Sequence, residues 1–250
     1  MIKSIATLFL AAGMIMSCKP VKASFNSDAA DNAASRKDYI ERTYKCAAFD
    51  KVDIGTVASV TITQSVGTEV KVIAPEQFLK NLSVRSANGT LVMKMLKGYS
   101  SRHIDKKICI IISVPHLSSV IASGVGDVTL KGRFEEKMIS LEHSGVGEMT
   151  IENLNCQHLN AIQKGVGDLV VKGTANYASY TQMGVGNVNA EDMIAKEVLA
   201  SSVGVGELSC YASESITASA TGVGSVKYKG NPAKKNVQSL KGMGNVENDD

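Results

Sequence analysis

The side chains best placed to do chemistry recur at one point of a repeated motif. The motif is Gly-x-Gly, and a short polar residue follows its second glycine in successive copies. The members of main interest are Asp127, Glu148, Asp168, Asn187 and Glu207, and the column continues with Ser225 and Asn245. Stacked copies would align these side chains about 5 Å apart. At that distance neighbouring carboxylates repel one another or recruit a cation such as Ca²⁺.

Three uses of this column are open. We favour the plainest, in which short polar residues suit a corner of the chain and remain solvated. The second is a weak cation or ligand ladder. The third is a carboxylate pair that acts on a polysaccharide, as in β-helix lyases and glycosidases. Those enzymes combine carboxylates with basic and aromatic groups in a cleft, and the centre of the column has neither.

The rest of the chain adds no catalytic or metal-binding motif. It has no G-x-S-x-G, no HExxH and no P-loop lysine, and no helix follows the Gly-x-Gly pairs as a dinucleotide site requires. His103, His116, His143 and His158 are scattered, as isolated structural histidines usually are. We therefore predict a protein that is not an enzyme, with no catalytic residue, no metal site and no cofactor.

The repeat itself predicts the elements that would position these side chains. The first glycines of seven copies stand at 124, 145, 165, 184, 204, 222 and 242, with valine or methionine between each pair. Apolar residues follow with period two, as in Val128 and Leu130, or Met149 and Ile151. Each unit is therefore expected to form two short strands that are buried by stacking coil on coil. We predict a parallel β-solenoid with coils of about 20 residues, in preference to an antiparallel meander or barrel.

Residues upstream of the glycine repeat are rich in strand patterns. Pro75 opens a possible short helix, Asn88-Gly89 indicates a hairpin turn, and the apolar run 108–115 predicts a fully buried strand. Because no linker precedes Gly124, we expect one β-helix domain over 46–250. Its cap and first coils would span 46–123, and the Gly-x-Gly repeats 124–250.

The N-terminus has the features of an export and anchoring signal. Residues 1–17 contain Lys3 and a short apolar run, which suits a secretory signal peptide. The run ends in Ile15-Met16-Ser17-Cys18, similar to the lipobox of bacterial lipoproteins, so we predict that Cys18 is lipidated. Residues 18–45 would be the lipidated end and a flexible tether. We expect an outer-membrane lipoprotein, with Lys19 and Lys22 favouring the periplasmic side over the surface.

Composition narrows the class further. The chain of 250 residues is 44% hydrophobic and 5% aromatic, with no tryptophan. A core built on large aromatic side chains is therefore disfavoured, and so is an aromatic surface on which sugar rings stack. A net charge of +3 is too small to indicate a nucleic-acid partner. Cys46, Cys109, Cys156 and Cys210 form an even set in which disulfides are permitted. Their pairing stays open, but Cys210 falls at an apolar core position and is expected to be a buried thiol.

Several motifs together carry a resemblance to a known family. They are Phe49-Asp50-Lys51-Val52, Val60-Thr61-Ile62-Thr63-Gln64, Asn88-Gly89-Thr90-Leu91-Val92, Ile112-Ser113-Val114-Pro115-His116-Leu117 and the repeated Ser-Gly-x-Gly-Asp. In this order they resemble the putative auto-transporter adhesin, head GIN domain family, a domain of unknown function in exported Bacteroidetes proteins. The resemblance covers 49 to about 248 and implies an exported right-handed β-helix. Valine between the glycines departs from the small polar residue that the family often has there.

These observations lead to one functional expectation with two alternatives. We expect a lipid-anchored, adhesin-like or scaffold module of the cell envelope without catalysis. Its partners would be the membrane, through the lipid, and a glycan or an envelope protein. The alternatives are a carbohydrate-active lyase or glycosidase on a β-helix, and a purely structural envelope protein. The ligand and the oligomeric state remain open at this stage.

Overall fold

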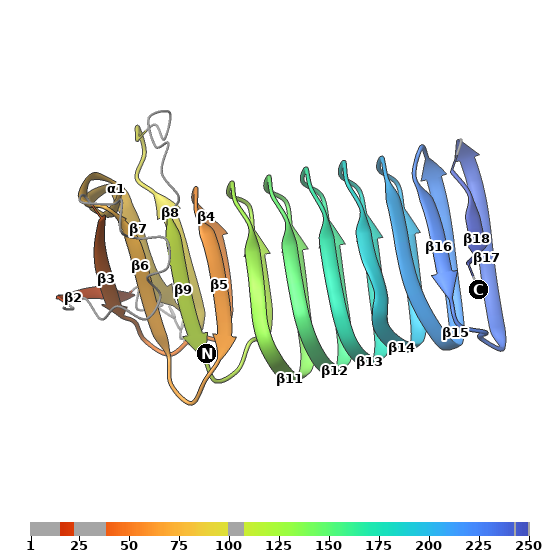
Figure 1. Cartoon of the computed structure of the whole chain (residues 1–250), viewed down its shortest axis with the longest axis horizontal. Helices are drawn as coiled ribbons and strands as arrows, with labels where there is room; N and C mark the ends of the chain where they lie inside the picture. The colour runs from red at the N-terminus through yellow and green to blue at the C-terminus, as the bar shows by residue number, and fades with distance from the viewer. Residues whose placement is uncertain (1–15, 23–38, 100–107, 243, 250) are drawn as a thin grey trace, which may run out of the picture.

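The protein is a parallel β-solenoid, as the repeat predicts (Figure 1). The computed structural model describes residues 16–22, 39–99, 108–242 and 244–249. The predicted signal peptide lies almost wholly outside the described residues, as does the central part of the predicted tether. The five central coils are built on strands β11 (Val128–His143), β12 (Met149–Gln163), β13 (Leu169–Gln182), β14 (Val188–Ser202) and β15 (Glu207–Gly222).

The stacking register follows the period-two pattern. Val128 pairs with Met149, which pairs with Leu169, and the column continues through Val188 and Leu208 to Val226. All are buried. The structure differs from the expectation in one respect, because each coil carries one long strand instead of two short ones. The chain turns inside that strand at a register shift, such as the one between Leu130 and Arg133, and keeps its hydrogen bonds to the next coil.

The two glycines of each corner are required for different physical reasons. The first lies against the coil below, and a Cβ on Gly165 would stand 2.0 Å from the carbonyl oxygen of Gly145. The second has a positive φ, as in Gly167 at 125°, which side chains with a Cβ rarely adopt. Close stacking and the direction of the turn therefore both require glycine. The narrow loops along the upper edge of Figure 1 are these corners.

A column of polar side chains is buried beside the corners. It comprises His143, Gln163, Gln182 and Ser202, each at most 1% exposed. The Nε2 of Gln163 donates to the carbonyl oxygens of Gly165 and Gly167, both at 2.9 Å. Its Oε1 accepts from the backbone nitrogen of Gly184 in the next coil, at 3.1 Å. The column thus satisfies backbone groups of the corners that would otherwise be buried without partners.

His143 makes the stability of the protein depend on pH. Burial lowers its pKa, although the nearby Asp127 opposes this, and its Nδ1 has no hydrogen-bond partner within the described part of the chain. A histidine in the unfolded chain titrates near ~6.5, so below that pH the unfolded chain binds more protons than the folded one. Stability should be complete above this pH and decline as the pH falls toward the lowered pKa of the folded state.

We expect His143→Gln to weaken this pH dependence, because glutamine already fills the same position in the next two coils. Chemical denaturation between pH 5 and 8 measures it. His158→Gln is the matched control, since His158 is exposed, and it should leave the slope of stability against pH as in the wild type. Equal slopes for the His143→Gln variant and the wild type would contradict the assignment.

The region upstream of the glycine repeat forms the first coils. Strands β4 (Lys51–Gly55) and β5 (Ser59–Gln64) stack in parallel beneath β10 (Ser119–Ala122) and β11. They stack in turn on β8 (Thr90–Met95) and β9 (Cys109–Val114). The run 108–115 is buried on one face only, because β9 alternates buried and half-buried residues. The expectation of a fully buried strand was therefore wrong, although β9 pairs with neighbours on both edges.

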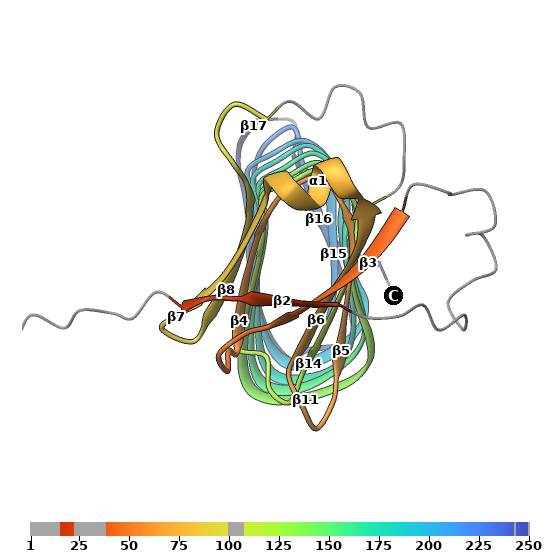
Figure 2. The same cartoon turned by 90° about the vertical axis from the view of Figure 1, so that its left-hand side faces the viewer.

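An antiparallel layer closes the N-terminal end (Figure 2). In it β6 (Glu69–Pro75) pairs antiparallel with β9 and with β3 (Tyr39–Lys45), β7 (Leu82–Ala87) pairs antiparallel with β8, and helix α1 (Glu76–Asn81) lies across the end of the coils. The predicted short helix and the Asn88-Gly89 turn are confirmed, with both turn residues at positive φ. Residues 39–45, assigned to the tether by composition, are strand β3, and their Tyr39 and Tyr44 are buried.

Cysteine 18 lies next to this cap. Short strands β1 (Met16–Ser17) and β2 (Lys19–Lys22) flank it and pair antiparallel with β7 and β3. Cys18 forms a disulfide with Cys46, and its side chain is buried. A thioether to lipid needs the same sulfur, so the disulfide and the predicted lipidation of Cys18 exclude each other. Cys109, Cys156 and Cys210 are free, and the expected burial of Cys210 is confirmed.

The C-terminal coils complete the stack. Strands β16 (Ser225–Lys229) and β17 (Lys234–Gly242) lie on β15, and β18 (Val246–Asn248) lies on β16. Val226 continues the apolar column that begins at Val128, and the buried Tyr228 pairs in register with Cys210 of the preceding coil.

Candidate functional site

The polar column after the glycines lies along one corner of the solenoid. Each member directly precedes a residue of the buried column that runs from Val128 through Met149 and Leu169 to Val188 and Leu208, so the members follow one another along this corner. Asp127 Oδ1 accepts a hydrogen bond from the backbone nitrogen of Glu148 at 3.1 Å, and Asp168 Oδ1 accepts from that of Asn187 at 2.7 Å. Asn187 Oδ1 accepts from Glu207 in the same way at 3.0 Å. These short side chains therefore tie each corner to the next coil.

The longer acidic side chains of the column have their own partners. Glu148 accepts from the hydroxyl of Thr150 in the same coil. Glu207 pairs with Lys227 at 2.9 Å, and Lys227 also lies 4.0 Å from Glu247. Over the ranges the structure describes, no three His, Cys, Asp or Glu side chains are grouped so that they could hold a metal ion. The geometry supports the solvated-corner interpretation, with backbone hydrogen bonding added.

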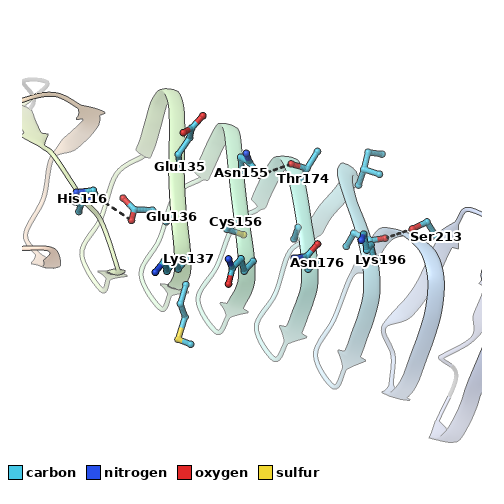
Figure 3. A pocket seen from close by; sticks show the side chains of 15 residues that line it. His116, Glu135, Glu136, Lys137, Asn155, Cys156, Thr174, Asn176, Lys196 and Ser213 are labelled. Atoms are coloured by element: carbon cyan, nitrogen blue, oxygen red, sulfur yellow. Dashed lines mark hydrogen bonds and ion pairs between the residues drawn. The ribbon is translucent and has the colours of Figure 1, made fainter.

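A groove runs across the coils at a different place (Figure 3). It has a volume of about 960 Å³ and crosses β11, β12, β13 and β14 to reach β15. Its residues come from the middle of each strand, where the chain turns between the flat faces of the coil. The sequence did not predict this groove as a site.

Small residues line the floor of the groove. Glu136, Cys156, Ala175 and Ala195 stand in register on four successive coils. Cys156 and the two alanines form the floor, and all three are buried. Their side chains have the inward parity of Phe134 and Leu154 and belong to the core, so the groove lies above them, between the outward-facing residues on either side. This column of small residues is the signal that could have located the site from the sequence.

Two rows of outward-facing side chains, most of them polar, make the walls (Figure 3). One row contains Asn155 and Thr174, whose hydroxyl lies 3.1 Å from Asn155 Oδ1, and continues with the exposed Ile194 on β14. The other row is Lys137, Gln157, Asn176 and Lys196. Amides, a hydroxyl and two ammonium groups therefore face a ligand laid across the coils, and they repeat with the spacing of the strands, about 4.8 Å.

Glu136 closes the N-terminal end of the groove. Its Oε1 accepts from the backbone nitrogen of Leu117 at 2.8 Å and lies 3.5 Å from Gln64 Nε2. Its Oε2 lies 3.6 Å from Nδ1 of His116. The side chain is 10% exposed, so this carboxylate is held by structural partners and anchors the loop after β9 to the repeat.

The Cys156 thiol in the groove is not activated as a nucleophile. Burial raises the pKa of the Cys156 thiol to about 11, so it stays protonated at neutral pH. No hydrogen bond or ion pair joins this thiol to a base in the described chain. Glu135 pairs with Arg133 on its own coil. The alternative of a carbohydrate-active enzyme gains no support from these side chains, which lack a carboxylate pair facing across the groove.

The described residues include no helix that is long and apolar enough to cross a membrane.

Comparisons with known proteins agree with the architecture. The family model described as putative auto-transporter adhesin, head GIN domain, matches residues 48–232. The crystal structure of a putative adhesin from Bacteroides fragilis is 39% identical with a TM-score of 0.82, covering 85% of this chain and 97% of that chain.

More distant solved structures share the fold alone. A putative lipid binding protein from Parabacteroides distasonis is 20% identical with a TM-score of 0.64, over 85% of this chain and 98% of its own. A putative adhesin from Parabacteroides merdae is 19% identical with a TM-score of 0.63, over 86% and 98%. No curated protein matches the chain.

Proposed function

The chain belongs to the putative auto-transporter adhesin, head GIN domain family, and from this premise we propose that it is a non-catalytic binding module of the cell envelope. The family is adhesin-like, which fits an exported or cell-surface protein. The groove across β11 to β15 would be its binding surface. One observation carries this proposal, namely the row of amide, hydroxyl and ammonium groups above a floor of small residues.

The shape of the groove favours an extended ligand. Its walls repeat once per coil, so a chain polymer lying across the strands would meet the same kinds of donors and acceptors at each step. Asn155, Gln157 and Asn176 can each donate and accept hydrogen bonds, as glycan hydroxyls and peptide groups require. A glycan or an extended segment of an envelope protein is therefore the class of ligand that we propose.

Binding to a glycan array tests the proposed groove. We expect the double variant Asn176→Ala and Lys196→Ala to lose at least tenfold in affinity for any glycan that the wild type binds, because two hydrogen-bonding groups are removed. The matched control is Asn153→Ala, an exposed asparagine on β12 outside the groove. Equal affinity of the double variant and the wild type would reject the groove as the site. Cleavage of a polysaccharide by the purified chain would reject the non-catalytic part of the proposal.

We also propose that the mature protein is held at the outer membrane by a lipid on Cys18. The lipobox-like Ile15-Met16-Ser17 supports this, and the periplasmic side is favoured by Lys19 and Lys22. In the lipidated form the disulfide with Cys46 cannot be present, so Cys46 would carry a free thiol. That thiol distinguishes the processed chain from the uncleaved chain.

A further inference from the structure

The valine between each glycine pair forms an exposed apolar stripe. We name it the valine ladder: Val125, Val146, Val166, Val185, Val205 and Val223. Each side chain is 48–57% exposed. Backbone bridges join neighbouring members from Val125 to Val205, so the side chains lie one above another along the corner. At about 4.8 Å per coil, the ladder follows nearly the full length of the repeat.

The ladder is more than a set of scattered surface residues. Glycines flank every valine, so its methyl groups stand on bare backbone without neighbours in their own coil. Met183 and Val203, both about half exposed, extend the stripe on one side, and a shallow hollow of about 510 Å³ lies between the two rows. Contiguous exposed apolar surface of this kind marks an interaction site. The backbone of the corner does not require valine, because its bridges involve main-chain atoms only.

Charges beside the ladder restrict what can cover it. Asp127, Glu148 and Asp168 follow the valines directly along the same corner. Inserting this edge into a lipid bilayer would strip water from those carboxylates, which is costly without partners. The covering surface must therefore be apolar in the centre and must offer hydrogen-bond donors opposite the carboxylates.

The other flank of the ladder offers such donors at the same heights. The residue before each first glycine is Ser123, Ser144 and then Lys164 in the first three coils. A second copy placed edge to edge and parallel, related by a two-fold axis along the solenoid, would bring valine onto valine. It would also set Ser123 opposite Asp127 of the other copy, Ser144 opposite Glu148 and Lys164 opposite Asp168. Within its own chain Lys164 already lies 3.2 Å from Glu142, and the two serine hydroxyls donate to backbone carbonyls at 3.4 and 3.5 Å, so the carboxylates of the other copy would share these donors.

An antiparallel pair would lack this match. Reversing one copy sets Glu148 opposite Glu207, where like charges repel, and sets Lys164 opposite Met183, so that its ammonium group no longer faces a carboxylate. In the C-terminal coils the parallel arrangement sets Met183 opposite Asn187 and Val203 opposite Glu207, and Glu207 already has Lys227 as its partner. We propose that the valine ladder is the interface of a parallel, two-fold symmetric homodimer. Both N-terminal caps then lie at the same end of the pair.

Cysteine cross-linking of the full-length chain in the expressing cells tests the proposal. In a parallel dimer every ladder residue faces its own counterpart, within the distance at which a disulfide forms. Val125→Cys and Val223→Cys, at opposite ends of the ladder, should each give a covalent dimer on a non-reducing gel. Met138→Cys, exposed outside the ladder, and the wild type are the controls and should not.

Other outcomes overturn the proposal. A cross-link that appears only when Val125→Cys and Val223→Cys are co-expressed would show an antiparallel pair. Equal cross-linking of Met138→Cys would show random collision. A second measurement uses Val166→Lys, whose exposed site tolerates the change. Sedimentation of the purified full-length chain should show at least tenfold weaker dimerisation than the wild type. A wild type that sediments as a monomer would contradict the dimer. So would a non-covalently bound acyl lipid, distinct from the lipid proposed on Cys18, that co-purifies with the wild type and is lost in Val166→Lys.

Discussion

Leu169→Asp should unfold the solenoid or destabilise it severely. Leu169 is fully buried and lies between Met149 and Val188 in the central apolar column. An aspartate there would place a carboxylate among aliphatic side chains, and the column offers it no cation. We expect a loss of roughly 4–5 kcal/mol or more in the free energy of unfolding, measured by chemical denaturation or seen as loss of soluble protein.

The matched control is Val170→Asp, one residue further along the same strand. Val170 faces outward and is half-buried, so its substitution should cost far less. Both variants introduce an aspartate into the same strand of the same coil, and they differ in the face of the sheet on which it stands. A Leu169→Asp protein as stable as the Val170→Asp protein would contradict the register on which the whole fold depends.

Cys18→Ala should abolish the incorporation of fatty acid into the protein. If Cys18 is the lipidated residue, its removal leaves no thiol at the cleavage site for the lipid, and metabolic labelling with a fatty acid should fall to background. The expected effect is all or none. Cys109→Ala is the control, because Cys109 is a free, partly exposed cysteine elsewhere in the chain.

A second readout separates lipidation from the disulfide. In the lipidated protein, Cys46 should react with a thiol reagent without prior reduction, under denaturing conditions that expose it. Protection of Cys46 until a reductant is added, together with equal labelling of the wild type and the Cys18→Ala chain, would show that the Cys18–Cys46 disulfide persists and that Cys18 carries no lipid.

The repeat made most of the fold predictable. Identical glycines at nearly constant spacing and period-two apolar residues left few arrangements open, and Val128, Met149 and Leu169 stack as that pattern requires. The first coils were predictable for a different reason, since no linker separates them from the repeat. The strand at Tyr39–Lys45 was missed because small polar residues precede it and dominate the local composition.

The candidate site was harder to predict because its residues form no recognised catalytic or binding motif. The acidic column was found from its regularity, yet its short members Asp127, Asp168 and Asn187 accept hydrogen bonds from the backbone of the next coil. The floor of the groove is lined by Cys156, Ala175 and Ala195, which form no recognised binding motif, and only their recurrence on successive coils could have indicated a site. The buried glutamines have the same parity as the apolar residues before them, so Gln163 and Gln182 could have been recognised as inward-facing.

The Gly-Val-Gly corner also bears on how such a protein can change over evolutionary time. Every corner offers the coil above it the same bare backbone and the same hydrogen-bonding groups. Duplication of one unit, or its deletion, therefore creates no unfamiliar junction, as in other repeat proteins. Each added unit would lengthen the molecule by about 4.8 Å, with the groove and the valine ladder growing in step. Reach and ligand length can thus be altered by copy number alone, without the invention of a new core.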